Sequence, residues 1–472
     1  MTDLLQAEPV VRVRAALREG PEAWLVGGVV RDAALGRPLR DVDLAVRGDA
    51  AAVARGLGAA LRGPVFPLSE QFGAWRVLES ERRFVCDVSP LQGDTIEQDL
   101  AQRDFAVNAM ATPLAGGDTL DPHGGRADLE ARVLRVLGAH AYEADPLRAL
   151  RLVRLAAELG FDPDAETERL TAAAAPRLTE PAPERVFGEL RRTIVAPAAL
   201  GGLGLGARLG VLGAVLPELT ALEGVEQSRF HHLDVFDHTM EVLRRLTELE
   251  GDLEPVFGEL AQPLREQLAQ PLADELTRGQ ALRFAALFHD VAKPVTRGLR
   301  ADGKVTFIGH DSAGEDMVAE IFRRLRTSER LRTYVGKLTR EHLVLGFLVR
   351  RRPLDDRAVH AYLRRTEPVE VEVTLLSCAD RLATRGEGQQ PWIDAHLELG
   401  REVMGPALEW RAQGPPRPLL RGDELAAELG ISPGPEVGVL LAELEEAAFA
   451  GEVGTRDEAL AYARRLRQNR AR

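Results

Sequence analysis

Two aspartates, Asp41 and Asp43, stand one residue apart between apolar residues in the stretch WLVGGVVRDAALGRPLRDVDLAV, which begins at Trp24. In an extended strand, residues i and i+2 point to the same face, so the two carboxylates would lie side by side. Like charges this close repel one another unless a divalent cation lies between them. Mg²⁺ is commonly held by one or two carboxylates together with substrate phosphates. The pair therefore predicts metal-assisted phosphoryl chemistry.

Gly27 and Gly28 precede this pair, where an apolar strand gives way to a helix that we expect over residues 29–36. Backbone N–H groups that no side chain obstructs could hold a triphosphate at such a turn. Arg31, one turn into the helix, could add a charge-assisted contact. An isolated Asp-x-Asp is more often a solvated turn, but the order strand, Gly-Gly, helix, Asp-x-Asp, strand favours a nucleotide and metal site.

Histidines and aspartates form a second set in the downstream half of the chain. Its members are His238, His289, Asp290, His310, His342 and Asp380. Neutral imidazoles and carboxylates are suitable ligands for transition metals or Mg²⁺. The adjacent His-Asp ends an apolar run, FAALFHD, where a charge must be paired or ligated. We expect His123, His140, His360 and His396 at the surface or in the core, and we assign no role to His231 and His232.

The elements that must position the first set lie within residues 1–140. Short apolar runs (AWLVGG, DVDLAV, GAWRVL, RRFVCDV and NAMATPL) alternate there with turns, which predicts a small mixed sheet with helices. From Asp145 onward the residues DPLRALRLVRLAAELGF show helical spacing, and Gly160 supplies a stop. Strand signals become scarce beyond this point. The fold class is therefore α/β (α+β) in the N-terminal part, followed by a mostly α-helical remainder.

Composition narrows the class of protein. A chain of 472 residues predicts two to four domains, and 45% hydrophobic with 28% charged residues is typical of a globular protein. Two distant cysteines, Cys86 and Cys378, exclude a disulfide framework and fit a reducing compartment. No signal peptide or membrane-length apolar run is evident, so we expect a cytoplasmic protein without a membrane partner. The net charge of -13 argues against a general nucleic-acid coat and leaves room for local arginine clusters.

Further stretches carry a family resemblance. QRDFAVNAMA, EADPLRALRLVRLAAELGF and ERVFGELRR follow the Gly-Gly and Asp-x-Asp elements in order. Together they resemble the class II tRNA nucleotidyltransferase and bacterial poly(A) polymerase family, whose head is of polymerase-beta type. The ordered His, His-Asp, Asp series resembles the HD superfamily of metal-dependent phosphohydrolases. The resemblance implies a nucleotidyltransferase head over 1–140, a helical neck with a nucleotide-reading helix over 141–225, an HD domain over 226–390, and a helical C-terminal region over 391–472 that docks tRNA or is structural.

The resemblance also implies residue roles. Asp41 and Asp43 would bind Mg²⁺, Gly28, Arg31 and Arg103 would contact the nucleotide, and Asp145, Arg148, Arg151 and Arg154 would form the reading helix. Residues 145, 148 and 151 recur at i, i+3 and i+6, a spacing that predicts one shared helix face. A carboxylate accepts from an exocyclic amine and a guanidinium donates to a ring or carbonyl acceptor, so an Asp–Arg pair suits cytosine and adenine. The alternative is intrahelical Asp–Arg pairing on a surface.

For the HD series, the resemblance implies a divalent metal (Mg²⁺, Mn²⁺, Ni²⁺ or Co²⁺) at His238, His289, Asp290 and Asp380. His310 and His342 would be additional ligands of a second metal. The alternative is an inherited HD fold without turnover.

The implied reaction is attack of an RNA 3′-hydroxyl on the α-phosphate of CTP or ATP, with release of pyrophosphate. We expect an enzyme that adds CMP, AMP or both to the tRNA 3′ end, with tRNA, CTP and ATP as partners. The alternatives are a poly(A) polymerase and an HD phosphohydrolase with an RNA-binding N-terminal module. Paired carboxylates argue against a mere binding module. An acidic chain whose tail is basic only in RRLRQNRAR favours tRNA over unstructured RNA.

One segment bears on which bases are added. Many full CCA-adding relatives place a longer mobile loop between the strand that ends near Val88 and the motif at Arg103. Here only SPLQGDTIEQ is available, and Gly93 is its obvious hinge. The short segment predicts that two cytidines are added efficiently and the terminal adenosine poorly or not at all.

Overall fold

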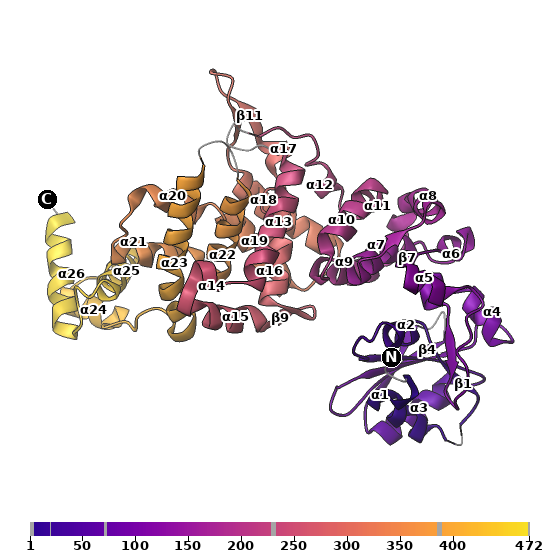
Figure 1. The fold of residues 1–472 in the computed structure, drawn as a ribbon. Coiled ribbons are helices and arrows are strands. Elements are labelled where there is room, and N and C mark those ends of the chain that lie inside the picture. The colour runs from indigo at the N-terminus through magenta and orange to yellow at the C-terminus, as the bar shows by residue number, and fades with distance from the viewer. Residues whose placement is uncertain (1–3, 19, 70–72, 228–232, 385–388, 471–472) are drawn as a thin grey trace. The chain divides into compact units, whose positions relative to one another are not determined.

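The chain forms two compact units, Met1–Val215 and Leu216–Arg472 (Figure 1). The computed structural model describes residues 4–18, 20–69, 73–227, 233–384 and 389–470. We call the two parts unit 1 and unit 2 and describe each by itself.

Unit 1 is built on a six-stranded mixed sheet with the strand order β3-β4-β5-β2-β1-β6. Its strands are β1 (Ala23–Val26), β2 (Asp41–Val46), β3 (Val65–Ser69), β4 (Ala74–Leu78), β5 (Val85–Pro90) and β6 (Ala111–Pro113). Strand β2 runs parallel to β5, and the other pairs are antiparallel. Val42 and Leu44 are buried on one face of β2, so Asp41 and Asp43 occupy the other. The mixed sheet expected from the apolar runs is confirmed, and β3 was not expected.

Short helices accompany this sheet. They are η1 (Leu4–Gln6), α1 (Glu8–Ala16), α2 (Gly28–Ala34), α3 (Ala50–Leu61), α4 (Ile96–Ala101), η2 (Ala106–Asn108) and α5 (Gly125–Ala131). Helix α3 begins after Asp49, whose carboxylate accepts a hydrogen bond from the Ala52 N–H at 3.0 Å, and it packs against β4 and β5. Helix α2 begins directly after the Gly27 turn, close to the range that the sequence predicts.

The rest of unit 1 is helical apart from the short paired strands β7 (Val133–Leu134) and β8 (Asp162–Pro163). It contains α6 (Ala139–Ala144), α7 (Arg148–Leu159), α8 (Ala165–Ala174), η3 (Ala175–Thr179), α9 (Pro183–Val195), α10 (Ala199–Arg208) and α11 (Val211–Val215). Helix α7 packs between α9 and α10 and ends at Gly160, whose φ of 67° is the left-handed conformation that glycine adopts readily. The predicted stop at Gly160 is confirmed.

Unit 2 is helical with two short hairpins. Its first helices are α12 (Pro217–Thr220), α13 (Val235–Gly251), α14 (Glu254–Phe257), η4 (Gly258–Leu260), α15 (Ala261–Ala269), α16 (Arg278–Phe288), α17 (Lys293–Thr296), α18 (His310–Arg324) and α19 (Glu329–Glu341). The hairpins pair β9 (Pro271–Ala273) with β10 (Leu276–Thr277), and β11 (Arg297–Leu299) with β12 (Val305–Phe307). There follow α20 (Val344–Leu348), η5 (Val349–Arg351), α21 (Asp356–Thr366), α22 (Glu370–Ala383) and α23 (Gln390–Gln413).

The last helices of unit 2 pack around a small core of their own. They are α24 (Gly422–Leu429), α25 (Pro435–Phe449) and α26 (Arg456–Arg470), and their buried side chains include Leu425, Leu440 and Ala459. Pro435 occupies the first position of α25, where its missing N–H has no helical partner to lose. The sequence Pro433-Gly434-Pro435 lies between α24 and α25 and opens the second of these helices.

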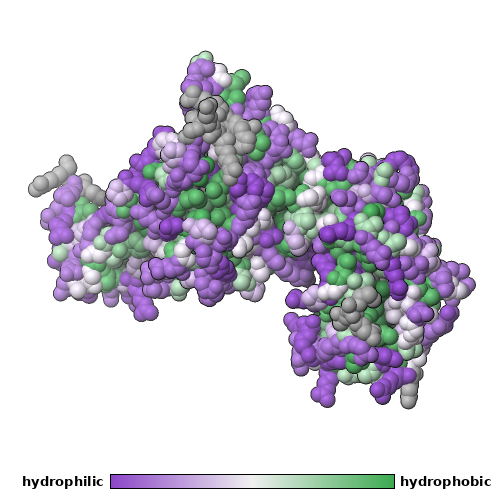
Figure 2. Space-filling view, viewed as in Figure 1, coloured by the Kyte–Doolittle hydropathy of each residue, from purple (hydrophilic) through white to green (hydrophobic). Residues whose placement is uncertain are grey.

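Hydrophilic residues dominate the face of the molecule that Figure 2 shows. None of the helices in the described ranges is long and apolar enough to cross a membrane.

Candidate functional site

In the Gly-Gly turn of unit 1, backbone that carries no side chain lies next to the Asp43 carboxylate. Gly27 has φ 71°, and a Cβ atom added there would lie 3.0 Å from Nη1 of Arg103 and 3.5 Å from Oδ2 of Asp43. A Cβ atom on Gly28 would lie 3.7 Å from the same oxygen. A side chain at Gly27 would therefore fill the space between the turn, the carboxylate and the guanidinium, which explains the glycine at this position.

Asp41 and Asp43 lie side by side on one face of β2, as predicted. The parallel register places Asp87 of β5 opposite Asp43, so three carboxylates share this face. Asp87 is held by Arg76, whose Nε and Nη2 donate to it at 2.8 and 2.7 Å. Within the described ranges, Asp41 and Asp43 accept no hydrogen bond and form no ion pair.

Electrostatics at this pair favour a cation. Burial, reinforced by the Asp87 charge, raises the pKa of Asp43 to about 6. Desolvation also raises the pKa of Asp41, against the opposing effect of Arg192. Two unpartnered carboxylates that resist ionisation, beside the Cβ-free backbone of Gly27, fit a divalent metal with oxygen ligands.

These groups open into a cavity of about 930 Å³ within unit 1. Gly28, Arg31, Asp41, Asp43, Arg103, Asp145, Arg148, Arg151 and Arg154 all line it, so the structure brings every predicted site residue of unit 1 together. Arg103 is oriented by Asp99, which accepts from its Nε and Nη2 at 3.0 and 2.8 Å.

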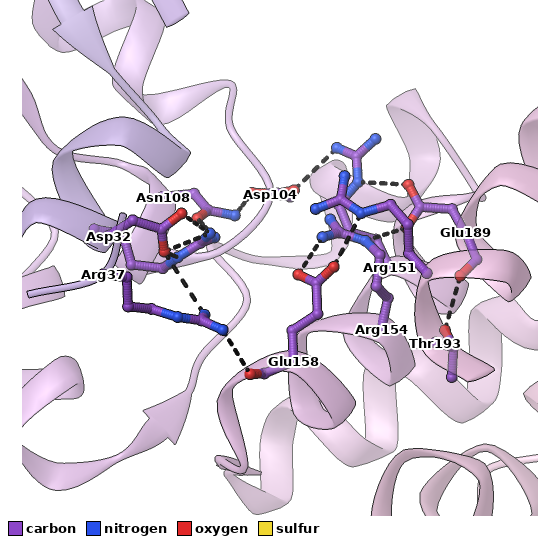
Figure 3. A network of polar contacts seen from close by, with 11 residues as sticks. Asp32, Arg37, Asp104, Asn108, Arg151, Arg154, Glu158, Glu189 and Thr193 are labelled. Atoms are coloured by element: carbon purple, nitrogen blue, oxygen red, sulfur yellow. Dashed lines mark hydrogen bonds and ion pairs between the residues drawn. The ribbon is translucent and has the colours of Figure 1, made fainter. Parts of the chain in front are cut away.

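Asp104, which also lines the cavity, joins the motif at Arg103 to helix α7. Its Oδ1 accepts from Nδ2 of Asn108 at 3.0 Å and its Oδ2 accepts from Nη1 of Arg151 at 3.0 Å (Figure 3). Burial alone would raise the pKa of the Asp104 carboxyl, but Arg151 and Arg148 hold it well below its usual range. Asn108 also accepts from Nη1 of Arg31 at 2.7 Å. Arg31 is thereby connected, through Asn108 and Asp104, to Arg151 in the helical part of unit 1.

Glu189 of α9 extends this network. It accepts from Nε of Arg151 at 3.2 Å and from Nε of Arg154 at 2.5 Å, and Glu158 accepts from Nη1 of Arg154 at 2.7 Å (Figure 3). Arg154 is only 6% exposed. Arg151 and Arg154, two of the three arginines predicted for the reading helix, are therefore neutralised by carboxylates from α7, α9 and the Asp104 segment, which fixes their positions.

Asp145 differs from its prediction. It ends α6 in extended conformation (φ −152°), and α7 begins only at Arg148. The expectation that residues 145, 148 and 151 share one helix face is wrong because Pro146 follows Asp145 directly and keeps it out of the helical region. Asp145 and Arg148 nevertheless both line the cavity.

The residues of this site that the sequence reasoning missed include Asp87, Asp104, Asn108 and Glu189. Asp104 and Asn108 stand within QRDFAVNAMA, and Glu189 stands within ERVFGELRR, so the motifs contained them without revealing their partners. Asp87 depends on the β2–β5 register, which no local signal gives.

The second set gathers in unit 2 around Asp290. Nε2 of His289 lies 3.1 Å and Nε2 of His238 lies 3.8 Å from Oδ2 of Asp290. Nε2 of His310 lies 3.3 Å and Nε2 of His342 lies 3.9 Å from its Oδ1. Two groups could each hold a metal ion, His238–His289–Asp290 and Asp290–His310–His342, and they share Asp290. Asp380 adds an oxygen 3.0 Å from Nε2 of His238.

Backbone hydrogen bonds fix the tautomer of three of these imidazoles. Nδ1 of His289, His310 and His342 lies 2.8, 2.7 and 2.6 Å from a backbone carbonyl three residues earlier, which assigns the proton to Nδ1. Each Nε2 then presents its lone pair toward Asp290, and Nε2 of His289 is buried without a hydrogen bond. Burial and the neighbouring His289 lower the pKa of His342 to about 4, so it is neutral at pH 7. This donor set fits a pair of divalent metals.

A lysine also contacts this centre, and the remaining histidines of unit 2 have other surroundings. Nζ of Lys293 lies 2.6 Å from Oδ2 of Asp290, so a cation that the sequence reasoning missed faces this centre. His360 and His396 are buried, and His396 contacts Ser377 at 3.0 Å. His231 and His232 lie outside the described residues.

Comparisons with known proteins agree with this arrangement. Residues 23–92 and 74–135 match the Poly A polymerase head domain, 160–223 match the Probable RNA and SrmB- binding site of polymerase A, and 235–385 match the HD domain. The chain is 38% identical to an A-adding tRNA nucleotidyltransferase of Deinococcus radiodurans, covering 94% of this chain and 95% of that protein. It is 36% identical to a CC-adding tRNA nucleotidyltransferase of Thermus thermophilus, covering 93% of each. The fold resembles that of a Thermotoga maritima CCA-adding enzyme complexed with tRNA, with a TM-score of 0.61, 19% identity and coverage of 98% and 96%.

Proposed function

The chain belongs to the tRNA nucleotidyltransferase family, and from this premise we propose that unit 1 adds CMP, AMP or both to the 3′ end of tRNA. The observation that carries the proposal is the meeting of Asp41, Asp43 and the Gly27 turn at one cavity that also receives Asp145 and Arg148. Template-independent transfer of a nucleotide needs carboxylates to hold a metal, backbone N–H groups to hold the triphosphate, and side chains that select the base.

In this proposal Asp41 and Asp43 hold Mg²⁺, which when bound lowers the pKa of the attacking 3′-hydroxyl and neutralises charge on the α-phosphate. Gly28 leaves space for the triphosphate, and Arg31 and Arg103 orient it by charge-assisted hydrogen bonds. Asp99, Asn108 and Asp104 hold those two guanidiniums in place.

Base selection is assigned to Asp145 and Arg148. A carboxylate accepts the exocyclic amine of cytosine or adenine and repels the carbonyl of uracil or guanine, while a guanidinium donates to a ring acceptor. Arg151 and Arg154 support this surface from α7, because Asp104, Glu158 and Glu189 already occupy their donors.

We infer that addition is restricted to the two cytidines. The segment between β5 and α4 is tied down: the Gln92 N–H donates to Asp99 at 3.0 Å, the Asp94 N–H donates to Gln98 at 2.7 Å, and Arg47 donates to the Asp94 carbonyl at 2.8 Å. A Cβ atom on Gly93 would lie 2.6 Å from Oε1 of Gln98, so this turn has little room to change. Such a segment is poorly suited to switch the cavity from cytosine to adenine.

The experiment that tests the function is incubation with tRNA transcripts that end before, within and just short of CCA, with each nucleotide supplied separately. Two cytidines added to the shortest transcript support the proposal. Addition of adenosine alone, to a transcript ending in CC, contradicts the cytidine restriction and leaves nucleotidyl transfer standing. No incorporation with any nucleotide contradicts the function itself.

The geometry of unit 2 favours a second activity, metal-dependent hydrolysis of phosphate esters at the centre around Asp290. Two ligand groups that share one carboxylate could place two cations close enough to act on one phosphate. Lys293 would lie beside that phosphate and stabilise its charge. Hydrolysis of a simple phosphate ester with Mg²⁺, Mn²⁺, Ni²⁺ or Co²⁺ tests this proposal, and the absence of hydrolysis with all four would leave the HD fold a structural one.

A further inference from the structure

Arg185 holds Asp145 from outside the cavity. Its Nη2 donates to Oδ2 of Asp145 at 2.6 Å, across 40 residues of sequence. The Asp145 side chain is 12% exposed and lines the cavity, whereas Arg185 is 46% exposed and does not line it. The other carboxylate oxygen, Oδ1, accepts from the Leu147 N–H at 3.3 Å. Both oxygens of Asp145 therefore have a fixed partner.

The support beneath Arg185 is rigid. Arg185 stands in the first turn of α9, two residues after Pro183, whose ring fixes the backbone at the helix start. Its own N–H donates to the Ala182 carbonyl at 2.9 Å. The guanidinium therefore reaches Asp145 from an anchored helix end.

Arg148 has a separate support. Its guanidinium donates to the backbone carbonyls of Gln102, Arg103 and Ala141 at 2.9, 3.3 and 3.2 Å. Its Nε is buried without a hydrogen-bond partner in the described part of the chain. The Arg148 N–H donates to the Asp145 carbonyl at 3.0 Å, but within the described part of the chain their side chains share no hydrogen bond or ion pair, so the two side chains are held by separate partners.

We propose that Arg185 is a positioning residue that sets nucleotide selectivity by fixing the carboxylate plane of Asp145. The proposal rests on the proposed function of unit 1 and names a residue that determines its specificity. Arg185 acts through Asp145 and touches no substrate.

The orientation of the Asp145 carboxylate matters because the bases differ in the group that they present to it. Cytosine and adenine present an amine where uracil and guanine present a carbonyl, and a carboxylate oxygen accepts from the first and repels the second. This repulsion excludes uracil or guanine only when the Asp145 carboxylate oxygen is held in place and cannot rotate away from the carbonyl. Without Arg185 the carboxylate could rotate about its Cα–Cβ and Cβ–Cγ bonds and relieve the repulsion, while Asp41 and Asp43 would stay unchanged.

The test compares kcat and KM for CTP with those for UTP on a tRNA transcript that lacks CCA. The variants are Arg185→Ala, Arg185→Lys and Asp145→Asn. The control is Arg208→Ala, which removes a surface arginine paired with Glu168 at 2.9 Å across the same 40 residues but away from the cavity. Thermal unfolding of each variant checks its fold, and an ion pair this exposed contributes little to stability.

We expect Arg185→Ala to lower the ratio of kcat/KM for the preferred nucleotide to that for its carbonyl analogue at least about tenfold, which is about 1.4 kcal/mol. The change should arise mainly from more efficient use of the wrong nucleotide, with kcat for the right one nearly unchanged. Arg185→Lys should restore part of the ratio, and Arg208→Ala should leave it unchanged.

A ratio in Arg185→Ala within twofold of wild type, alongside lost selectivity in Asp145→Asn, would overturn this inference and leave the proposed function intact. If Arg185→Ala unfolds, Arg185→Gln takes its place: a ratio within twofold of wild type would overturn the inference, and a fall of about tenfold would support it. No incorporation by the wild type would refute the proposed function and the inference with it.

Discussion

Asp43 of β2 lies directly opposite Asp87 of β5 in the parallel register of the sheet. The two carboxylates have different partners: Arg76 neutralises Asp87, whereas no described residue forms an ion pair with Asp43. Asp43 and its neighbour Asp41 are therefore left available for a cation, and Asp87 with Arg76 shapes the edge of the site.

Asp41→Ala and Asp43→Ala should each reduce nucleotide incorporation by at least about a hundredfold, because a lost metal ligand removes several kcal/mol of transition-state stabilisation. Binding of tRNA and the thermal unfolding temperature should change little. Asp118→Ala, at an exposed position of unit 1, is the matched control. Activity above about a tenth of wild type in either variant would contradict the metal assignment.

The pKa of Asp43, raised to about 6, predicts a pH-dependent stability. The folded state keeps a proton at Asp43 that the unfolded state releases near the ordinary aspartate pKa of about 4. The contribution of this group to the free energy of unfolding is therefore full below about pH 4, falls as the pH rises from about 4 to 6, and is lost above pH 6. Mg²⁺ should reverse the trend, because it binds the ionised form. Thermal unfolding with and without Mg²⁺ at pH 5 and 7.5 should show metal stabilisation only at the higher pH, and the difference should vanish in Asp43→Asn.

Glu189→Gln should destabilise unit 1 by about 3 kcal/mol, because it leaves two buried arginines, Arg151 and Arg154, without their shared carboxylate. Denaturant unfolding measures the change. Glu168→Gln, which removes the surface partner of Arg208, should cost less than about 1 kcal/mol. Equal effects of the two substitutions would show that the network around Glu189 is not a buried support.

His289→Ala combined with Asp290→Ala should abolish metal-dependent phosphate ester hydrolysis, because Asp290 belongs to both ligand groups. Nucleotide incorporation should stay near the wild-type rate, since its groups lie in unit 1. A chelator should remove hydrolysis and added metal should restore it. His140→Ala, at an exposed position, serves as the control, and hydrolysis that survives the double substitution would place this activity elsewhere.

The sequence could predict the elements that depend on local pattern. Alternating apolar residues correctly predicted β2, the strand that carries both Asp41 and Asp43. Gly160 correctly predicted the end of α7. Partners that depend on register or on long-range packing could not be read in this way. Asp87 faces Asp43 only because β5 adds in parallel to β2, and Glu189 meets Arg154 only because α9 packs on α7. Asp145 was misplaced because helical spacing was extended across Pro146, against the local backbone preference.

Single-turnover extension of a tRNA transcript that lacks CCA, with CTP and ATP both present, tests the central claim most directly. The arrangement of Asp41 and Asp43 beside the Gly27 turn predicts nucleotide addition, and the tied segment around Gly93 predicts that it stops after two cytidines. Quantitative conversion to a CCA end would contradict the restriction to cytidine. A transcript that is not extended at all, in the presence of Mg²⁺, would contradict the account as a whole.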